Sequence, residues 1–392
     1  MTIDEKIKID NIELYQIAIP LLVPFEISGG RSYTRQSIII KMTSGNLIGY
    51  GESAPFDAPF YSSETISSVK AVLNEWLIPK VLNKEFSTIE EFNKELSVGV
   101  RGNNFAKAGI ENAYWDLVAK KNKLRLVDAI KIKLAQMGVN KEYLDYKEYI
   151  ESGVSVGIPE DRSLDTLKTW VADYVDEGYR RIKIKIKPGW DTRPAKAARE
   201  VIGSEFLFWV DANSSFELED IEVFQELDQL NCLFYEQPLN HDDIFDHNAL
   251  SKLVKTPICL DESLKSARVG RQVIELGEID VWNIKIQRIG GLLEGLKLYK
   301  LAVENGIKLW GGTMPESGLG AMPILALAAF DGFVYPADVE ASARWYGKNK
   351  DLIELEMDKE GKIYLPEGLG IGTEPNWEIM EKYGKKIASY YR

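Results

Sequence analysis

The second half of the chain repeats one pattern, in which a short apolar run ends in polar residues and a helical segment follows. The apolar runs begin 23 to 28 residues apart, at positions 154, 182, 206, 233, 258, 281, 308 and 333. Strands that alternate with helices of this length form right-handed βαβ units and a parallel sheet. Eight such units predict an α/β fold, a closed (β/α)8 barrel of the TIM type.

An open, doubly wound sheet is the competing fold for the same alternation. That fold usually carries a glycine-rich turn after its first strand. Here the glycine cluster WGGTMPESGLG lies at 310–320, after the seventh apolar run. We therefore expect the barrel.

The first 150 residues lack this alternation. Two apolar runs flank the turn residues 43–46, which predicts a β-hairpin. Helical patterns follow at about 63–82, 88–97 and 104–134. Strands followed by helices indicate an α+β domain, which we expect to cap the barrel.

The tail leaves the barrel through polar sequence. We expect strands at 352–358 and 362–365, joined by a turn, to form a hairpin that returns to the capping domain. The predicted organisation is a capping domain at 1–150, a barrel at 151–345 and a C-terminal segment at 346–392.

Composition excludes several classes of protein. The two cysteines, Cys232 and Cys259, form no CxxC pair, which disfavours a disulfide framework or a zinc site and favours a reducing compartment. A net charge of -12 disfavours nucleic acid, because counterion release rewards clustered cations. The N-terminus lacks the apolar core of a signal peptide, and the apolar run at 321–330 is shorter than the roughly 20 residues that span a bilayer. We expect a cytoplasmic protein that binds neither nucleic acid nor a membrane.

Histidine is scarce in this chain. His241 and His247 are the two histidines, and both lie in the polar segment NHDDIFDHN. Histidine is the side chain that most often transfers protons in enzymes. If the chain is an acid/base enzyme, another residue type has to do this work.

Lysines alternate with isoleucines in the second apolar run. Lys183 and Lys185 are two residues apart and share one face of a strand, while the isoleucines take the other. Alternating lysines are more common on a solvated edge strand. Because a closed barrel has no edge, we expect both lysines to face its interior; Lys187 continues the row.

Three acids stand at matching places after successive strands. Asp211 in VDAN, Glu236 in YEQP and Asp261 in LDES are each 25 residues apart, at the strand ends where such barrels carry their active sites. Converging carboxylates repel one another unless a cation lies between them, and oxygen ligands without His or Cys select Mg2+ (or Mn2+). The alternative is that each acid caps a helix or forms a surface pair, Asp261 especially.

Lys285 ends the sixth strand, across the barrel from Lys185. Burial, the neighbouring Lys183 and a nearby Mg2+ all disfavour the charged form of Lys185, so we expect a lowered pKa and a role as base. A metal bound to a substrate carboxylate stabilises the enediolate that forms when the α-proton leaves. The pattern predicts abstraction of a proton next to a carboxylate.

Together these motifs resemble the enolase superfamily, its muconate-lactonising subgroup and, within it, the o-succinylbenzoate synthase and N-succinylamino acid racemase family. The Lys-x-Lys motif matches Lys183 and Lys185 in RRIKIKIKPGWD, and the second catalytic lysine matches Lys285 in VWNIKIQRIGG. The family's metal ligands match the three acids, and the resemblance covers nearly the whole chain. It implies a modified, enolase-like barrel, catalysis by Lys185 and Lys285 on opposite faces of the substrate, and assistance from Lys183.

The resemblance also implies a substrate pocket. Segments 23–30 and 51–64 are similar to the family's mobile lid and pocket loop, and 310–320 to its seventh-strand loop. The substrate-binding residues that it implies are Phe25, Phe56, Tyr61, Ser155, Asn213, Arg288, Gly312, Met314 and Glu316. Arg288 resembles an arginine of the racemase-like branch. The alternatives are that the aromatics form interdomain core, that Arg288 makes a surface pair and that the loop is only a turn.

The predicted function is Mg2+-dependent formation of a metal-stabilised enediolate from a small anionic carboxylate substrate. The resemblance implies o-succinylbenzoate synthase activity, a dehydration in menaquinone biosynthesis, or N-succinylamino acid racemase activity, or both, in a homo-oligomer. Asp338 and Glu340 resemble the Asp-x-Asp pair of dipeptide epimerases, which keeps an epimerase or a muconate-type cycloisomerase as the alternative. A barrel that binds without catalysis is disfavoured, because all the charged site positions are present.

Overall fold

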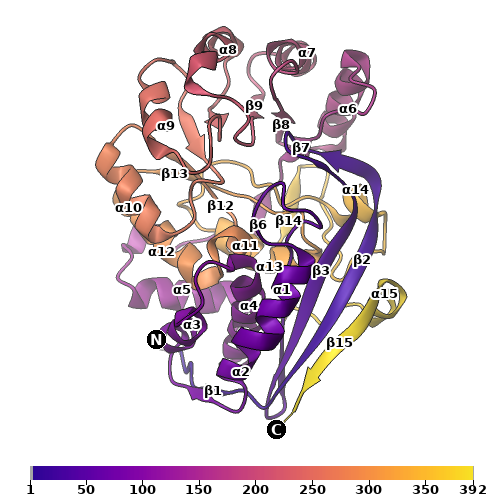
Figure 1. Ribbon diagram of the computed structural model, residues 1–392, viewed down its shortest axis with the longest axis vertical. Helices are drawn as coiled ribbons and strands as arrows, with labels where there is room; N and C mark the ends of the chain where they lie inside the picture. The colour runs from indigo at the N-terminus through magenta and orange to yellow at the C-terminus, as the bar shows by residue number, and fades with distance from the viewer. Residues whose placement is uncertain (1–2, 392) are drawn as a thin grey trace.

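Seven parallel strands form the barrel wall, and they neighbour one another in chain order. The structure, a computed structural model, describes residues 3–391. The strands are β7 (Val154–Val156), β8 (Arg181–Lys185), β9 (Leu207–Asp211), β10 (Tyr235–Glu236), β11 (Ile258–Leu260), β12 (Val281–Ile284) and β13 (Lys308–Gly311). Helices follow the strands and cover the outside of the sheet (Figure 1). They are α6 (Leu164–Glu177), α7 (Thr192–Ile202), α8 (Ile221–Leu227), α9 (Ile244–Ser251), α10 (Ala267–Leu276), α11 (Ile286–Ile289), α12 (Leu292–Glu304) and α13 (Gly318–Ala328).

The eighth apolar run closes the barrel by two isolated bridges; in the described chain it forms no regular strand. Phe333 bridges Leu309 of β13, and Ala337 bridges Ser152, next to β7. Pro336 lies between these bridges and has no N–H to donate, so the ladder is interrupted. The predicted TIM-type class is confirmed, whereas a regular strand beginning at Phe333 is wrong.

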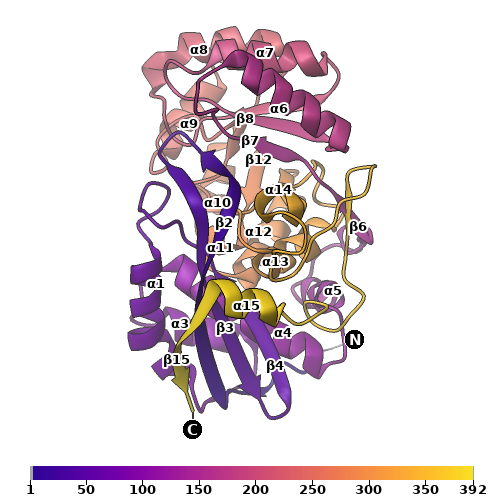
Figure 2. The same cartoon turned by 90° about the vertical axis from the view of Figure 1, so that its right-hand side faces the viewer.

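A four-stranded antiparallel sheet, in the order β15-β2-β3-β4, forms the second body of the fold. Its strands are β2 (Asn11–Glu26), β3 (Arg31–Ser44), β4 (Leu47–Ser53) and β15 (Gly384–Tyr390). The predicted hairpin is β3-β4, whose turn holds Gly45 at φ 55°, a conformation that favours glycine. The β2-β3 hairpin rises from this sheet until its tip lies beside the barrel strands β7 and β8 (Figures 1 and 2).

The predicted helical stretches of the capping domain are present. They are α1 (Ile66–Val72), α2 (Ile78–Val81), α3 (Ile89–Ser97), α4 (Asn104–Lys121) and α5 (Leu126–Gln136), with a π-helical turn, Leu73–Leu77, between α1 and α2. α1 and α4 pack on the antiparallel sheet, and β1 (Ile7–Lys8) pairs with β5 (Glu85–Phe86) below them. Within the described residues, the structure contains no helix whose length and apolarity would let it cross a membrane.

The tail reaches the capping sheet by a route that differs from the predicted hairpin. β15 pairs with β2, but residues 352–358, all of them described, form no strand. Backbone groups of this segment bond to Asn376 and Ser342 instead. β14 (Lys362–Tyr364) pairs with β6 (Tyr149–Glu151), so the predicted hairpin is wrong. The helices of the tail are α14 (Ser342–Tyr346) and α15 (Trp377–Tyr383).

Two buried carboxylates of the capping layer dock it onto the barrel. Glu111 of α4 accepts hydrogen bonds from the backbone N–H groups of Leu292 (2.6 Å) and Leu293 (3.0 Å), at the start of α12. Glu52 of β4 accepts from the N–H of Gly320 at 3.0 Å, in the first turn of α13. The first N–H groups of a helix have no partner within the helix, so these carboxylates satisfy them and fix the cap above the barrel.

We predict that Glu111→Ala lowers the free energy of unfolding by about 2 kcal/mol, because it leaves buried N–H donors without partners. Urea denaturation of the full chain measures this value. The control is Glu381→Ala, which removes an exposed helical glutamate and is expected to change it by less than about 0.5 kcal/mol. An unchanged midpoint for Glu111→Ala would contradict the docking role.

Candidate active site

The lysines of β8 face the inside of the barrel. β8 pairs with β7 on one side and with β9 on the other, so it is not an edge strand and that alternative is wrong. Ile182 and Ile184 pack in the main apolar core, while Lys183 and Lys185 are 1% and 4% exposed and contact acids within the barrel. The interior position predicted for both lysines is confirmed.

Aromatic side chains form the floor beneath these lysines. A separate buried cluster joins Trp209, Phe234, Cys259, Val281 and Trp310, one from each of five strands or strand starts. Arg181, at the start of β8, lies 4.1 Å from the ring centroid of Trp209 and 5.5 Å from that of Trp310. This packed layer fills the barrel below the site, so the site that holds the lysines faces the capping domain.

The three acids meet at the carboxyl ends of β9, β10 and β11. Strand register aligns Asp211 with Glu236, and ligand oxygens of Asp211, Glu236 and Asp261 all lie within 4.8 Å of one another. Each residue is fully buried. The N-cap residues of the helices that follow are Asp220, Asp243 and Ser266, and the side chains of Asp243 and Ser266 accept capping hydrogen bonds, so the capping alternative is wrong. A buried set of hard oxygen donors fits a divalent cation.

Lysines compensate these carboxylates on two sides. Lys185 Nζ lies 2.5 Å from an oxygen of Asp211, and Lys285 Nζ lies 2.8 Å from one of Asp261. Lys183 lies 3.4 Å from Asp211, 3.3 Å from Glu236 and 2.5 Å from Asp338. Such buried charges persist only when each is paired.

The two lysines on opposite sides of the barrel have pKa values shifted in opposite directions. Burial, with help from Lys183, lowers the pKa of Lys185 despite the attraction of Asp211. Although burial opposes it, the field of Tyr61 and of the site carboxylates raises the pKa of Lys285. Lys185 is thus suited to accept a proton and Lys285 to hold one.

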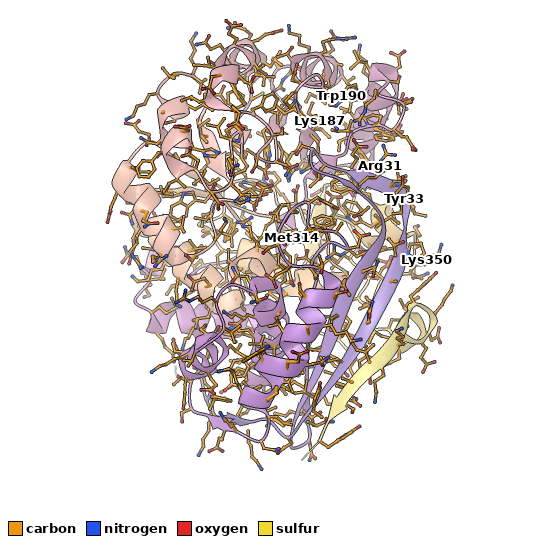
Figure 3. All side chains as sticks on the ribbon, in the orientation of Figure 1. Arg31, Tyr33, Lys187, Trp190, Met314 and Lys350 are labelled. Atoms are coloured by element: carbon orange, nitrogen blue, oxygen red, sulfur yellow. The ribbon has the colours of Figure 1, made fainter. Side chains whose placement is uncertain are left out.

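A cavity lies between the lysines and the capping domain. Six of the predicted substrate-binding residues line it: Phe25, Phe56, Tyr61, Ser155, Asn213 and Met314. Met314 lies near the middle of the molecule in Figure 3, at the level where cap and barrel meet. Tyr61 accepts a hydrogen bond from Lys285 Nζ at 3.4 Å, and burial raises its pKa to about 12.

Three predicted substrate-binding residues support the cavity from behind and do not line it. Arg288 pairs with Asp261 and donates to the backbone carbonyl of Asn283 at 2.6 Å. A Cβ on Gly312 would lie 2.8 Å from Lys285 Cε, so glycine leaves the room that this lysine needs. Glu316 is buried and accepts from the N–H of Met314.

Ile27, Thr313, Pro315 and Trp345 also line the cavity and were not predicted as substrate contacts. Asp338 and Glu340 line it as well; they were considered only as the acid pair of the epimerase alternative. Thr313 and Pro315 flank Met314 in the glycine-rich loop, so their positions could have been inferred from it. Trp345 reaches the cavity from α14, a short helix at the end of the barrel segment, and no local pattern marks it.

The chain is similar to known proteins over almost its whole length. Residues 11–130 match the family model "Mandelate racemase / muconate lactonizing enzyme, N-terminal domain", and residues 166–379 match "Enolase C-terminal domain-like". An o-succinylbenzoate synthase from Bacillus subtilis is 37% identical, with 97% of this chain and 98% of that protein covered. An N-succinylamino acid racemase from Thermus thermophilus is 38% identical, with 96% and 97% covered. The crystal structure of an enolase superfamily member from Listeria innocua has a TM-score of 0.86 at 33% identity and covers 98% of each chain.

We predict that Asp211→Asn combined with Asp261→Asn weakens Mg2+ and Mn2+ binding by more than roughly 100-fold. Loss of a residue that only hydrogen-bonds to a metal ligand already lowers metal affinity by roughly 10- to 100-fold, and this double variant removes the charge of two ligands. Isothermal titration calorimetry measures the affinity, and near-UV circular dichroism checks the fold. Glu340→Gln serves as the control, since it removes a buried carboxylate of the same cavity that lies outside the triad. Equal metal binding by the double variant and the wild type would refute the site.

Proposed function

The chain belongs to the mandelate racemase/muconate lactonizing enzyme family of the enolase superfamily, within its o-succinylbenzoate synthase and N-succinylamino acid racemase group, and from this premise we propose that it removes the proton α to a substrate carboxylate. Two outcomes share this step: dehydration to o-succinylbenzoate and racemisation of N-succinylamino acids. The observation that carries the proposal is the pair of buried lysines, Lys185 and Lys285, on opposite sides of one carboxylate triad.

The triad fits Mg2+ (or Mn2+), held by Asp211, Glu236 and Asp261. When bound, this cation supplies electrostatic stabilisation of the negative charge that develops on the substrate carboxylate. The protein's own groups do the rest. Lys185 takes the α-proton on its face, and Lys183 contacts the substrate carboxylate.

The fate of the anion then separates the two reactions. For racemisation, Lys285 delivers a proton to the opposite face. For dehydration, Lys285 steadies the anion with its positive charge while Lys185 returns its proton to the departing hydroxyl group on the same face. One cavity serves both reactions, because they need the same lysines around the same carbon.

The acids of the cavity favour these reactions over dipeptide epimerisation. Asp338 already pairs with Arg181 at 2.5 Å and with Lys183 at 2.5 Å. Glu340 pairs with Arg344 at 2.9 Å and accepts from the N–H of Ser155 at 2.9 Å. Because both acids are already paired with cations of the protein, neither is available to bind the free α-ammonium of a dipeptide. An N-succinylamino acid has no α-ammonium and does not need such a partner.

The remaining parts of the proposal follow the family resemblance. Phe25, Phe56, Tyr61 and Met314 enclose the distal part of the substrate, and Ser155 and Asn213 offer polar contacts. Arg288, Gly312 and Glu316 act through the residues that they support. The enzyme works in the cytoplasm as a homo-oligomer, and dehydration would place it in menaquinone biosynthesis.

We expect Lys185→Ala to lower both dehydration and racemisation by at least roughly 1000-fold, and Lys285→Ala to lower racemisation by a similar factor, as for loss of a general base or acid. Ultraviolet absorbance follows dehydration, and polarimetry follows racemisation from each enantiomer. The control is Lys196→Ala, which removes a surface lysine paired with Glu226 and should leave both rates within twofold. Near wild-type racemisation of both enantiomers by Lys285→Ala would refute the two-lysine mechanism.

Charge compensation in the cavity also predicts the preferred amino acid. N-succinylphenylalanine should be racemised with a kcat/KM more than roughly tenfold above that of N-succinyllysine. The buried acids Asp338 and Glu340 are already paired with protein cations, so they cannot compensate the side-chain ammonium of the lysine derivative. Steady-state polarimetry on the two substrates gives this ratio. A preference for the lysine derivative would show that Glu340 or Asp338 is released to bind substrate.

A further inference from the structure

The tip of the β2-β3 hairpin is joined to the capping sheet through an irregular segment. Regular pairing between the two strands stops at Pro20 and resumes at Phe25, which faces Ser32. In the gap, Leu22 and Val23 are 55% and 53% exposed. Residues 25–32, which overlap the lid-like segment 23–30 and are called the lid from here on, are joined to the sheet where residues 21–24 of β2 and Tyr33 of β3 have no register partners, which allows them to move as a unit.

Glu26 joins the lid to the barrel by ion pairs. Its Oε1 accepts from Arg162 Nη2 at 2.5 Å and from Lys187 Nζ at 3.3 Å, and both cations belong to the barrel. Its Oε2 accepts from Nε of Arg31, within the lid, at 2.9 Å. The Glu26 side chain is 9% exposed, so these partners compensate a nearly buried charge. Arg31 and Lys187 both lie around the upper end of the hairpin in Figure 3.

The residue before Glu26 reaches the catalytic cavity. The ring of Phe25 packs edge-on against Trp345, with centroids 5.1 Å apart, and its centroid lies 5.9 Å from Lys185 Nζ. Gly157 of the barrel permits this approach, since a Cβ there would lie 3.1 Å from the carbonyl oxygen of Glu26 and 3.3 Å from Phe25 Cδ2. The two neighbouring residues are thus held by one surface, Glu26 by charge and Phe25 by packing.

We propose that Glu26 is a positioning residue whose ion pairs with Arg162 and Lys187 latch the lid to the barrel and hold Phe25 over Lys185. Its effect on turnover rests on the proposed function, whereas the latch is a property of the fold alone. Without the latch the lid opens at the irregular segment while the sheet stays intact. For a substrate that binds only the closed form, the apparent dissociation constant is the intrinsic one divided by the closed fraction, so KM rises when the lid opens. The turnover of bound substrate, kcat, is little changed.

Two variants separate the latch from the stability of the hairpin. Glu26→Gln removes the charge at constant size, and Arg162→Gln combined with Lys187→Gln removes the barrel partners of Glu26 while leaving the Glu26–Arg31 and Arg31–Glu160 pairs in place. The matched control is Glu13→Gln, a buried glutamate of the same strand that pairs with Lys41 and Lys386 within the sheet. Amide hydrogen exchange across residues 21–32 is measured on the full chain, and KM and kcat are measured with N-succinylphenylalanine.

We expect KM to rise about tenfold in both latch variants, with kcat within twofold, as for a closed fraction reduced to about a tenth. Because exchange follows the open fraction, exchange in 21–32 should rise by at least that factor in a protein whose lid is mostly closed. The control should keep wild-type values. Wild-type exchange in Glu26→Gln overturns the latch, and faster exchange with an unchanged KM overturns its role in substrate binding. If the wild type neither racemises an N-succinylamino acid nor forms o-succinylbenzoate, the proposed function fails, and the exchange measurement still decides the latch; if it only forms o-succinylbenzoate, KM and kcat are measured for that reaction.

Discussion

The mutual repulsion of three buried carboxylates is the constraint on which the rest of this structure depends. Asp211, Glu236 and Asp261 are brought within 4.8 Å by the register of neighbouring parallel strands. Three like charges at that separation, away from water, require cations around them. Lys183, Lys185, Lys285 and Arg288 provide these charges. An anionic substrate with a divalent cation would be compensated by the same groups, so one arrangement serves both folding and chemistry.

The capping domain covers this charged site and excludes water from it. Glu52 and Glu111 bond to the first turns of α13 and α12, which fixes the cap as a body. The β2-β3 hairpin reaches further, and at the barrel the side chain of Glu26 pairs with Arg162 and Lys187, while Arg31 pairs with Glu160. Excluding water strengthens the electrostatic interactions inside the cavity. The cap is therefore held at its base by hydrogen bonds from barrel N–H groups to buried carboxylates and at its tip by ion pairs.

The barrel and the charged centre of the site were predictable because they follow local rules. Alternation with period two put Lys183 and Lys185 on one face, and equal spacing put the three acids at one end of the barrel, as the structure has them. The predictions that were wrong or missing concern contacts between residues distant in the sequence, or a single residue that interrupts a strand. Pro336 interrupts the eighth strand, residues 352–358 bond to Ser342 and Asn376 rather than to a strand, and Trp345 enters the cavity from a helix without a distinctive pattern. The pairing of Lys187 with Glu26, 161 residues away, is equally invisible to local patterns.

The central claim is that lysines and a divalent cation together labilise the proton next to a carboxylate. Proton NMR in D2O tests it most directly, by following the α-proton signal of N-succinyl-L-phenylalanine and its D enantiomer with the enzyme. The account predicts that the α-proton of both enantiomers exchanges for deuterium with Mg2+ or Mn2+ present, and that a chelator stops the exchange. Exchange that persists at the same rate after complete metal removal, or no exchange by an enzyme that binds both metal and substrate, would contradict it.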